Sequence, residues 1–340
     1  KYQYWDITTL AYNWYNNEEA NMGFVLKAIN EQEANCRATF HGPGHSWNKP
    51  AVIISYKSTV GIEDYYNYQT FGHGRAGASY ISDYSMQNTL IVPLIQSSSE
   101  VMPFSLNLVY NSAYGGRYFT EDSDFGNEAQ MLHTKDYSDM LMYVGWKLSA
   151  QQTVVPFSIG NKNYLIYTDG DGTEHYFADD DEDGTSEATD HDGIYEDEDG
   201  LKYKITISGT NYTMTNRTDY KWHFTNGYLT KEEDAYGNHI DYHYAENSSK
   251  LLRITRTNVG CTTEETLVTL SYGWEGVDLD QFPSAFTDQY GRTTRIMYAS
   301  PNSSIYYLRR ITFPDEQYAD YIYTNQTRGH MKGYRLTQVY

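Results

Sequence analysis

The residues best placed for chemistry form an acidic run near the middle of the chain. The pattern D-x-D-x-D-G, with a further acid at position twelve, is the oxygen-ligand spacing of calcium-binding loops. The predicted ligands are the side chains of Asp179, Asp181, Asp183 and Glu187, the backbone carbonyl of Thr185 and the closing carboxylate of Asp190. Position twelve is Asp instead of the usual Glu, and flanking helices are not evident. A solvated acidic loop explains the same residues, so calcium, the one cofactor suggested, remains one of two interpretations.

Exposed aromatic side chains near the start of the chain suggest a second kind of chemistry, the stacking of rings on sugar faces. The candidates are Trp5, Trp14 and Trp47, and Trp47 lies in a Gly- and Asn-containing segment that is typical of a loop. Aromatic rings with a polar edge pack equally well in a protein core. Carbohydrate binding and core packing are therefore both open for these residues.

Catalysis is not indicated by any motif of this chain. The 10 His residues are scattered, and the sequence lacks G-x-S-x-G, H-E-x-x-H and a paired Cys and His motif. Paired carboxylates are abundant, but an acidic loop produces them without any positional information about a catalytic dyad. We therefore predict a protein that is not an enzyme.

The charge of the chain excludes some partners. The net charge is -20, and residues 169–199 contain 15 Asp and Glu with no Lys or Arg. Nucleic-acid binding needs a basic surface that neutralises phosphates, and none is present. No run of about 18 apolar residues exists that would span a membrane. We predict no nucleic-acid partner and no membrane span.

A tyrosine-rich phrase recurs through the last third of the chain and indicates a stacked structural unit. The Asp that opens each copy recurs at separations of 54 and then 27 residues. The copies read Asp234-Ala-Tyr236-Gly237-Asn238-His-Ile240-Asp-Tyr242-His-Tyr244, then Asp288-Gln-Tyr290-Gly291-Arg292-Thr-Thr-Arg-Ile296-Met-Tyr298, then a weaker Asp315-Glu-Gln-Tyr318-Ala-Asp-Tyr321-Ile322-Tyr323.

Each copy predicts a tight turn followed by a strand. Apolar and polar residues alternate at period two, so Ile240, Tyr242 and Tyr244 share one face of a strand. The Gly of each copy accepts positive φ in the turn, and the leading Asp accepts hydrogen bonds from nearby backbone amides. Stacked copies would form one long antiparallel sheet, so the sequence predicts an all-β protein.

The first block, residues 1–57, begins with a short predicted helix over residues 5–14. Three predicted strands follow, at residues 23–27, 37–41 and 51–56. The order W-D-I-T, G-F-x-L-K and P-A-V-I-I-S-Y resembles the C-terminal half of the DNRLRE-type β-sandwich. That resemblance implies carbohydrate binding on a secreted or surface protein, with half of the sandwich missing upstream.

The remainder of the chain resembles the opening of RHS/YD-repeat proteins, a family that includes teneurin-like proteins and the shells of polymorphic toxins. A connector with Gly61-Ile-Glu63-Asp-Tyr65 precedes the strand Pro103-Phe-Ser105-Leu106 and the pair Gly145-Trp146, followed by the tyrosine phrases. The resemblance implies a connector at residues 58–100 and a repeat shell over residues 101–340. An acidic insert at residues 169–200 would interrupt that shell.

The resemblance also implies a fold and a function. The antiparallel sheet would spiral as part of a hollow shell that displays or encloses a C-terminal effector or toxin of the same polypeptide. Such a protein would be a non-catalytic scaffold, secreted or associated with the bacterial cell wall. The alternative is a surface adhesin that binds cell-wall or extracellular polysaccharide through residues 1–57 and uses the repeats as a stalk. Both ends of the chain look cut, so we expect a piece of a longer protein.

Overall fold

A computed structural model gives the fold of residues 7–15, 60–112, 118–119, 145–159, 162–179, 194–197, 200–246, 248–273, 282–302, 305–328 and 331–340. The chain divides into two compact units, residues 1–57 and residues 58–340. The described part of the first unit contains helix α1 (Thr8–Tyr15), where the sequence predicts a short helix. The three strands that the sequence predicts between residues 23 and 56 lie outside the described residues.

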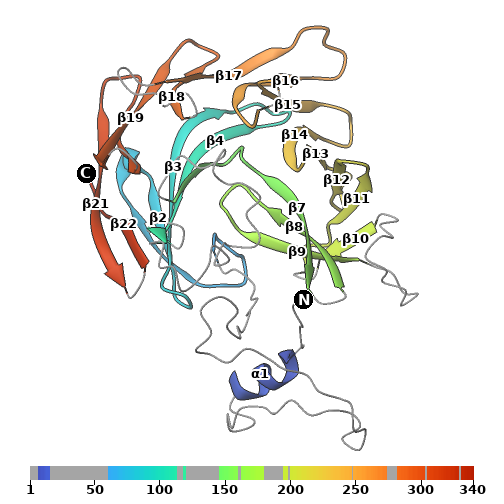
Figure 1. The fold of residues 1–340 in the computed structure, drawn as a ribbon. Helices are drawn as coiled ribbons and strands as arrows, with labels where there is room; N and C mark the ends of the chain where they lie inside the picture. The colour runs from blue at the N-terminus through green and yellow to red at the C-terminus, as the bar shows by residue number, and fades with distance from the viewer. Residues whose placement is uncertain are drawn as a thin grey trace, which may run out of the picture. The chain divides into compact units, whose positions relative to one another are not determined.

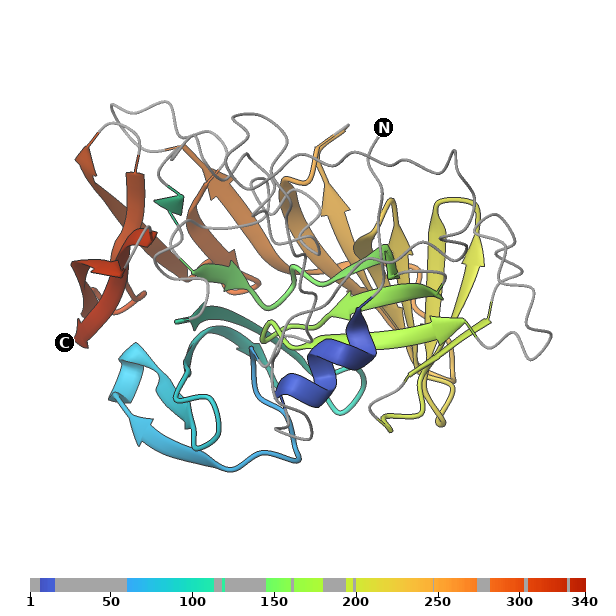
Figure 2. The same cartoon turned by 60° about the horizontal axis from the view of Figure 1, so that its bottom comes forward.

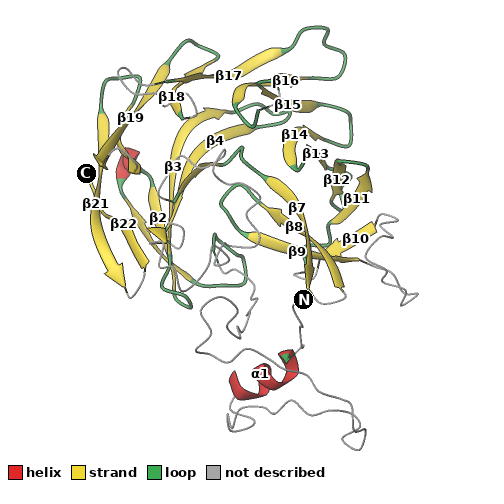
Figure 3. Ribbon diagram, viewed as in Figure 1, coloured by secondary structure: helices red, strands yellow, loops and turns green. Residues whose placement is uncertain are grey.

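The described part of the second unit consists almost entirely of β-strands (Figure 3), which confirms the predicted all-β class. No helix in the described part of the chain is long and apolar enough to cross a membrane. The strands belong to two systems, a small antiparallel sheet and a larger ring. Both systems belong to the second unit, residues 58–340.

The small sheet has five strands in the order β1-β2-β3-β4-β6, and we call it the plug sheet. Its strands are β1 (Tyr68–Gly72), β2 (Ala78–Ser82), β3 (Asn88–Ser97), β4 (Phe104–Asn111) and β6 (Trp146–Leu148), with the 3-10 helix η1 (Gly74–Ala76) between β1 and β2. Three of these strands lie within residues 58–100, where the sequence predicts only a connector. The alternating, deeply buried residues of β3 and β4 explain this difference, because they make that segment part of the core.

The ring is formed by the remaining strands, which we call the wall. In chain order they are β5 (Tyr118–Phe119), β7 (Thr153–Ile159), β8 (Lys162–Thr168), β9 (Glu174–Asp179), β10 (Ile194–Asp197), β11 (Lys204–Ser208), β12 (Asn211–Thr215), β13 (Lys221–Thr225), β14 (Tyr228–Glu233), β15 (His239–Tyr244), β16 (Leu251–Thr257), β17 (Glu265–Tyr272), β18 (Pro283–Asp288), β19 (Thr293–Asn302), β20 (Ile305–Thr312), β21 (Tyr318–Arg328) and β22 (Met331–Val339). From β7 to β22 each strand pairs with the next along the chain in antiparallel register.

The wall closes on itself twice. The wider closure runs from β22 through β5 to β7. A second closure joins β14 to β7, where Tyr228 lies opposite Thr153 and Val154 donates its N–H to the carbonyl of Gly227 at 3.0 Å. This second contact turns β7 to β14 into an eight-stranded barrel, from which the rest of the wall continues.

The plug sheet packs against the inner face of the wall. Figure 1 shows β3 and β4 within the curve of the wall strands, and Figure 2 shows the same arrangement from a second direction. The two systems share one core of buried apolar side chains. Hydrogen bonds cross between them, from Tyr321 Oη to the Ala76 carbonyl and from the Leu336 N–H to Tyr110 Oη. Arg256 also donates to the carbonyl of Met102.

Consecutive antiparallel strands place alternate turns at opposite edges of a sheet. The turns after β8, β12, β14, β16, β18 and β20 therefore all lie at one edge of the wall, which we call the rim. The tyrosine phrases at Asp234 and Asp288 both fall on this edge.

Trp146 should make the largest single contribution to the attachment of the plug sheet. Its indole is fully buried, and Nε1 donates a hydrogen bond of 2.6 Å to Tyr323 Oη of the wall. Trp146→Ala should lower the free energy of unfolding by about 3–5 kcal/mol through the cavity it leaves. The matched change Tyr323→Phe removes the acceptor alone and should cost about 1–3 kcal/mol. Urea unfolding followed by fluorescence measures both, and wild-type stability of Trp146→Ala would contradict this attachment.

Candidate functional site at the rim

Five turns of the rim share one hydrogen-bond pattern, and we call them rim turns. In each, the N–H of position one donates to the carbonyl of position five, and the N–H of position four donates back to the carbonyl of position one. Position four has positive φ in all five. The rim turns are residues 169–173, 216–220, 234–238, 288–292 and 313–317.

The two turns of the tyrosine phrases are built alike, as the sequence predicts. Asp234 Oδ1 accepts the N–H groups of Tyr236 and Asn238, both at 2.9 Å. Asp288 Oδ1 accepts those of Tyr290 and Arg292, again at 2.9 Å. A carboxylate that accepts these bonds is favoured in its charged form, and the pKa of each Asp is lowered although burial opposes the change.

The conformational requirement of the turn falls on position four. Gly237 has φ of 90° and Gly291 has φ of 77°, a region that residues with a Cβ rarely adopt. Position three, in contrast, points to solvent. Tyr236 is 84% exposed and Tyr290 is 72% exposed, so these tyrosines of the phrase do not contribute to the core.

The third copy of the phrase is displaced from its predicted position. Phe313 occupies position one, and Asp315 occupies position three. The repeat separation is therefore 54 and then 25 residues, not 54 and 27. Phe313 has no side-chain acceptor. Asp315 accepts the N–H of Gln317 at 3.3 Å and pairs with Arg75. This turn thus lacks the bonds that an Asp at position one makes.

Tyrosine hydroxyls tie the far ends of the wall hairpins together. The last tyrosine of a hairpin donates to a backbone carbonyl at the start of the hairpin's other strand, at 2.6–2.9 Å: Tyr244 to Leu229, Tyr272 to Leu251 and Tyr298 to Pro283. Tyr244 and Tyr298 are therefore equivalents, ten residues after position one. Tyr323 holds the same place after Phe313, but it accepts from Trp146 instead. Tyr242 lies two residues before Tyr244 on β15, and its hydroxyl donates to Glu232.

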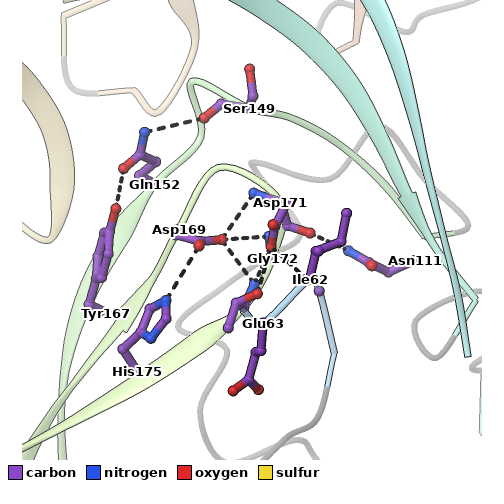
Figure 4. Close-up of polar contacts among 12 residues, drawn as sticks. Ile62, Glu63, Asn111, Ser149, Gln152, Tyr167, Asp169, Asp171, Gly172 and His175 are labelled. Atoms are coloured by element: carbon purple, nitrogen blue, oxygen red, sulfur yellow. Dashed lines mark hydrogen bonds and ion pairs between the residues drawn. The ribbon is translucent and has the colours of Figure 1, made fainter. Parts of the chain in front are cut away.

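The first rim turn, residues 169–173, differs from the others because it is covered. Asp169 Oδ1 accepts the N–H groups of Asp171, Gly172 and Thr173, each at 3.0 Å, as Figure 4 shows for the first two. Gly172 and Thr173 are buried, whereas the matching residues of the turn at Asp288 are exposed. The same local structure is here placed beneath the plug sheet.

Two residues of the plug sheet and one from the segment before β1 bind this turn directly. Lys147 Nζ donates to the carbonyl of Asp169, and Asn111 Nδ2 donates to the carbonyl of Asp171 at 2.9 Å. The N–H of Ile62 donates to Asp171 Oδ1 at 3.3 Å. These contacts join β4, β6 and the segment before β1 to one turn of the wall, as the right side of Figure 4 shows for Asn111 and Ile62.

The approach of the two surfaces leaves no room for side chains at two glycines. A Cβ at Gly61 would lie 2.1 Å from Thr173 Oγ1, and one at Gly172 would lie 2.6 Å from Asn111 Nδ2. Both glycines also have positive φ, 93° and 96°. Each glycine backbone packs against side chains of the opposite surface, and any larger residue would separate the plug from the turn.

The other side of the turn faces the barrel. His175 Nε2 lies 3.3 Å from Asp169 Oδ2, and the His175 ring stacks on Tyr167 with ring centroids 5.6 Å apart. Tyr167 Oη donates to Gln152 Oε1 at 2.6 Å, and Gln152 in turn donates to the carbonyl of Ser149. This chain of contacts returns to the loop that follows β6 (Figure 4).

The ionisable groups of this site have shifted pKa values. Burial, and then the charge and hydrogen bonding of Asp169, raise the pKa of Asp171 to about 7. Burial alone would raise the pKa of Asp169, but hydrogen bonds with His175 and Asp171 and the charge of Lys147 lower it. Burial lowers the pKa of Lys147 to about 8 against the opposing attraction of Asp169, Asp171 and Glu174.

The arrangement holds two parts of the fold together. The Lys147 side chain is buried, and its ammonium is committed to a backbone carbonyl. Asp169 and Asp171 each accept hydrogen bonds from the surrounding backbone. The polar atoms of the site face each other across the boundary between plug and wall, so their chemistry is that of a docking contact.

The other predicted sites are not brought together within the described residues. Asp179 ends β9, while Asp181, Asp183, Thr185, Glu187 and Asp190 lie outside the described part of the chain. Trp14 lies in α1, and Trp5 and Trp47 are outside the described residues. Where residues are described, no group of three His, Cys, Asp or Glu is arranged to hold a metal ion. Calcium and carbohydrate binding stay predictions.

Sequence reasoning missed the cluster around residues 169–173. Two signals were present. Position three of this turn is Asp171, where the tyrosine phrases carry an exposed Tyr. Lys147 is the one charged residue in the apolar strand β6. Neither signal identifies its partner, because Lys147 and Asp171 come from different parts of the chain and meet only in the fold.

Gly291→Ala should measure the cost of position four. The added methyl meets nothing within 4 Å, so the destabilisation comes from φ of 77° alone. We expect a loss of about 1–2 kcal/mol in the free energy of unfolding. Gly72→Ala is the control, because its site is equally open and its φ lies outside the left-handed region. Equal stabilities of the two variants in denaturant unfolding would argue against a conformational role for Gly291.

Asp169→Ala and Asp288→Ala remove the same acceptor from a covered and an open turn. In the open turn water replaces the carboxylate, and we expect a loss of about 1 kcal/mol. In the covered turn the N–H of Asp171 loses its acceptor, while those of Gly172 and Thr173 keep their bonds to the Asp169 carbonyl and to Asp171 Oδ1, and we expect about 2–3 kcal/mol. The comparison of unfolding midpoints tests whether the turn at Asp169 is buried in solution, and equal losses would show that it is not.

Comparison with known proteins does not identify a family for this chain. None of the protein-family models matches the chain, and none of the curated proteins does. The function is therefore inferred from the rim turns, from the docking contact at Asp169 and from the resemblances carried by the sequence.

Proposed function

We propose that this chain is a non-catalytic structural scaffold, the opening part of an RHS/YD-repeat shell. In this proposal the wall is the beginning of a sheet that continues to spiral into a hollow shell. The scaffold displays or encloses a C-terminal effector of the same polypeptide, in a protein that is secreted or associated with the bacterial cell wall. The repeated rim turn is the observation that carries the proposal.

The repetition of the turn supports a role in construction. Within the described residues, five hairpins of the wall use one backbone pattern, and two of them add a tyrosine hydroxyl bond at the opposite edge, as does the hairpin β16–β17. Such a unit contacts chiefly its neighbours and can be added many times without redesign. A binding or catalytic site, in contrast, depends on residues that occur once.

The use of polar side chains supports the same role. Arg256 pairs with Glu265 of the wall at 2.7 Å and donates to the Met102 carbonyl. The second contact joins the wall to the loop between β3 and β4 of the plug sheet. The cluster around Asp169 joins them a second time. Buried charged groups usually mark either a functional site or a structural tie, and both of these clusters span two elements of the fold.

The adhesin alternative depends on Trp5, Trp14 and Trp47 in residues 1–57. Residues 7–15 are the described part of that block, and carbohydrate binding there stays a prediction.

The scaffold role predicts protection of the effector from proteases. The test uses the polypeptide encoded by the complete reading frame, purified whole and treated with trypsin, with the C-terminal fragments identified by mass spectrometry. We expect the segment that follows the repeats to be cleaved slowly in the wild type. Trp146→Ala leaves a large cavity and should weaken the attachment of the plug sheet to the wall. We therefore expect it to increase that cleavage rate by about tenfold or more.

Tyr236→Ala is the matched control, because it removes an aromatic side chain from the exposed rim and should leave the cleavage rate unchanged. Equal cleavage of the C-terminal segment in the wild type and in Trp146→Ala would overturn the enclosing role. The enclosing role would also be overturned if the segment within the whole wild-type protein were cleaved as fast as the isolated effector.

A further inference from the structure

Half-buried aromatic side chains gather at the rim end of the eight-stranded barrel. Trp222 of β13 lies on the same face as the fully buried Phe224, because residues two apart in a strand share a face. Tyr203 and Tyr220 contact the Trp222 ring, with ring centroids 5.4 Å and 4.6 Å away. We call these three aromatic residues the mouth cluster. They pack against the buried core but stay partly exposed, and the strands that carry or flank them follow one another in the barrel (Figure 1).

A carboxylate lies beside the mouth cluster. Glu232 of β14 is directly opposite Trp222 in the β13–β14 register, so the two side chains lie on the same face of the sheet. Glu232 Oε2 accepts a hydrogen bond from Tyr220 Oη, and Oε1 accepts one from Tyr242 Oη, both at 2.6 Å. Both partners are neutral phenols, and among the described residues no Lys, Arg or His pairs with Glu232. Its charge is therefore hydrogen-bonded but not neutralised within that part of the chain.

Further carboxyl groups make the surroundings of the mouth cluster negative. Asp197 ends β10, and its Oδ1 accepts the N–H of Tyr203 at 2.8 Å. Its Oδ2 is buried and has no hydrogen-bond partner. Burial raises the pKa of the Tyr203 hydroxyl, and three carboxyl groups raise it further: Asp169, Asp197 and Asp64. A positive group placed against these rings would therefore meet negative charge from several sides.

We propose that the mouth cluster and Glu232 form a binding site for a small organic cation that carries a trimethylammonium group, such as choline. The faces of aromatic rings attract cations electrostatically, and the face of Trp does so most strongly. Glu232 supplies the full negative charge that the rings lack. The mouth of a β-barrel is also a frequent location for small-molecule sites. This binding site goes beyond the scaffold function and does not depend on it.

The chemistry of the site selects the class of cation. Both oxygens of Glu232 already accept phenol hydrogen bonds, and ring faces offer no strong acceptor. A primary ammonium would give up water without equivalent hydrogen bonds in return, whereas a trimethylammonium group has no N–H and packs its methyl groups on the rings. The hydroxyl of choline is a donor, the kind of group that Asp197 Oδ2 lacks.

The negative surroundings also disfavour ligands that carry an anionic group of their own. Phosphocholine contains the same trimethylammonium group as choline but adds a phosphate. The site should therefore bind choline at least about fivefold more tightly than phosphocholine at low salt. Equal affinities for the two ligands would overturn the assignment of the site to a free cation.

Calorimetric titration of the intact protein with choline chloride tests the proposal. We expect a dissociation constant on the order of 1 mM, as a few cation–π contacts allow. Neohexanol is the neutral analogue of choline, in which carbon replaces the nitrogen, and it should bind at least about tenfold more weakly. Absence of choline binding at about 50 mM would overturn the proposal, and so would equal binding of neohexanol.

Two substitutions separate the contributions of ring and charge. Trp222→Ala removes the central ring and should weaken choline binding by about tenfold or more. Glu232→Gln keeps an acceptor for a phenol but removes the charge, and it should weaken binding by about five- to tenfold. Tyr290→Ala is the matched control, because it removes an exposed rim aromatic outside the barrel whose ring already lies under Arg292. The control should bind choline as the wild type does, and wild-type affinity in Trp222→Ala or in Glu232→Gln would overturn the site.

An NMR measurement covers the case in which Trp222→Ala does not fold. The indole N–H signal of Trp222 in the wild type is assigned by its loss in the conservative variant Trp222→Phe, which keeps a ring. Addition of choline should shift this signal, and Trp222→Phe should weaken binding by only about two- to fivefold. Binding of choline that leaves the Trp222 signal unchanged would overturn the location of the site.

Discussion

One carboxylate oxygen that accepts several backbone N–H groups is the interaction on which this wall depends. A tight turn leaves its amides pointing inward without partners, and an unpaired amide is costly once neighbouring hairpins exclude water. Asp234 and Asp288 solve this at position one, and a residue with positive φ at position four completes the turn. Asn216 accepts the same bonds without a charge, so the acceptor matters more than the ionisation. Each hairpin can then be repeated, because its turn is complete before any neighbour is added.

The same turn gains a different role when it is covered. At residues 169–173 the turn is closed as elsewhere, and the backbone carbonyls of Asp169 and Asp171 also accept hydrogen bonds from the plug sheet. Replacing the exposed tyrosine of position three by Asp171 brings a second carboxylate into a site with little water. A motif that only closes a hairpin at Asp288 thus becomes an attachment point at Asp169. The difference lies in the environment of the turn and not in its backbone.

Much of the wall was predictable from the sequence, because period-two alternation and turn residues are local signals. The turns at Asp234 and Asp288 and the inward faces of β15 and β19 follow from them. Other features depend on contacts between distant residues. Nothing in the local pattern distinguishes Gly61 as a site of backbone approach to Thr173, or assigns β1 to β3 to a plug instead of a connector. The displaced turn at Phe313 was missed because Asp315 mimics the expected residue two positions late.

The double closure of the wall has a mechanical consequence. Within the described residues, β21 and β22 are joined by eight residue pairs, whereas β7 meets β14 at one residue pair and β5 meets β22 at two. Load applied across the wall therefore concentrates at these short seams, where few hydrogen bonds carry it. The long pairings divide the same load among more hydrogen bonds and yield last. A wall built in this way parts at its seams while its hairpins stay folded.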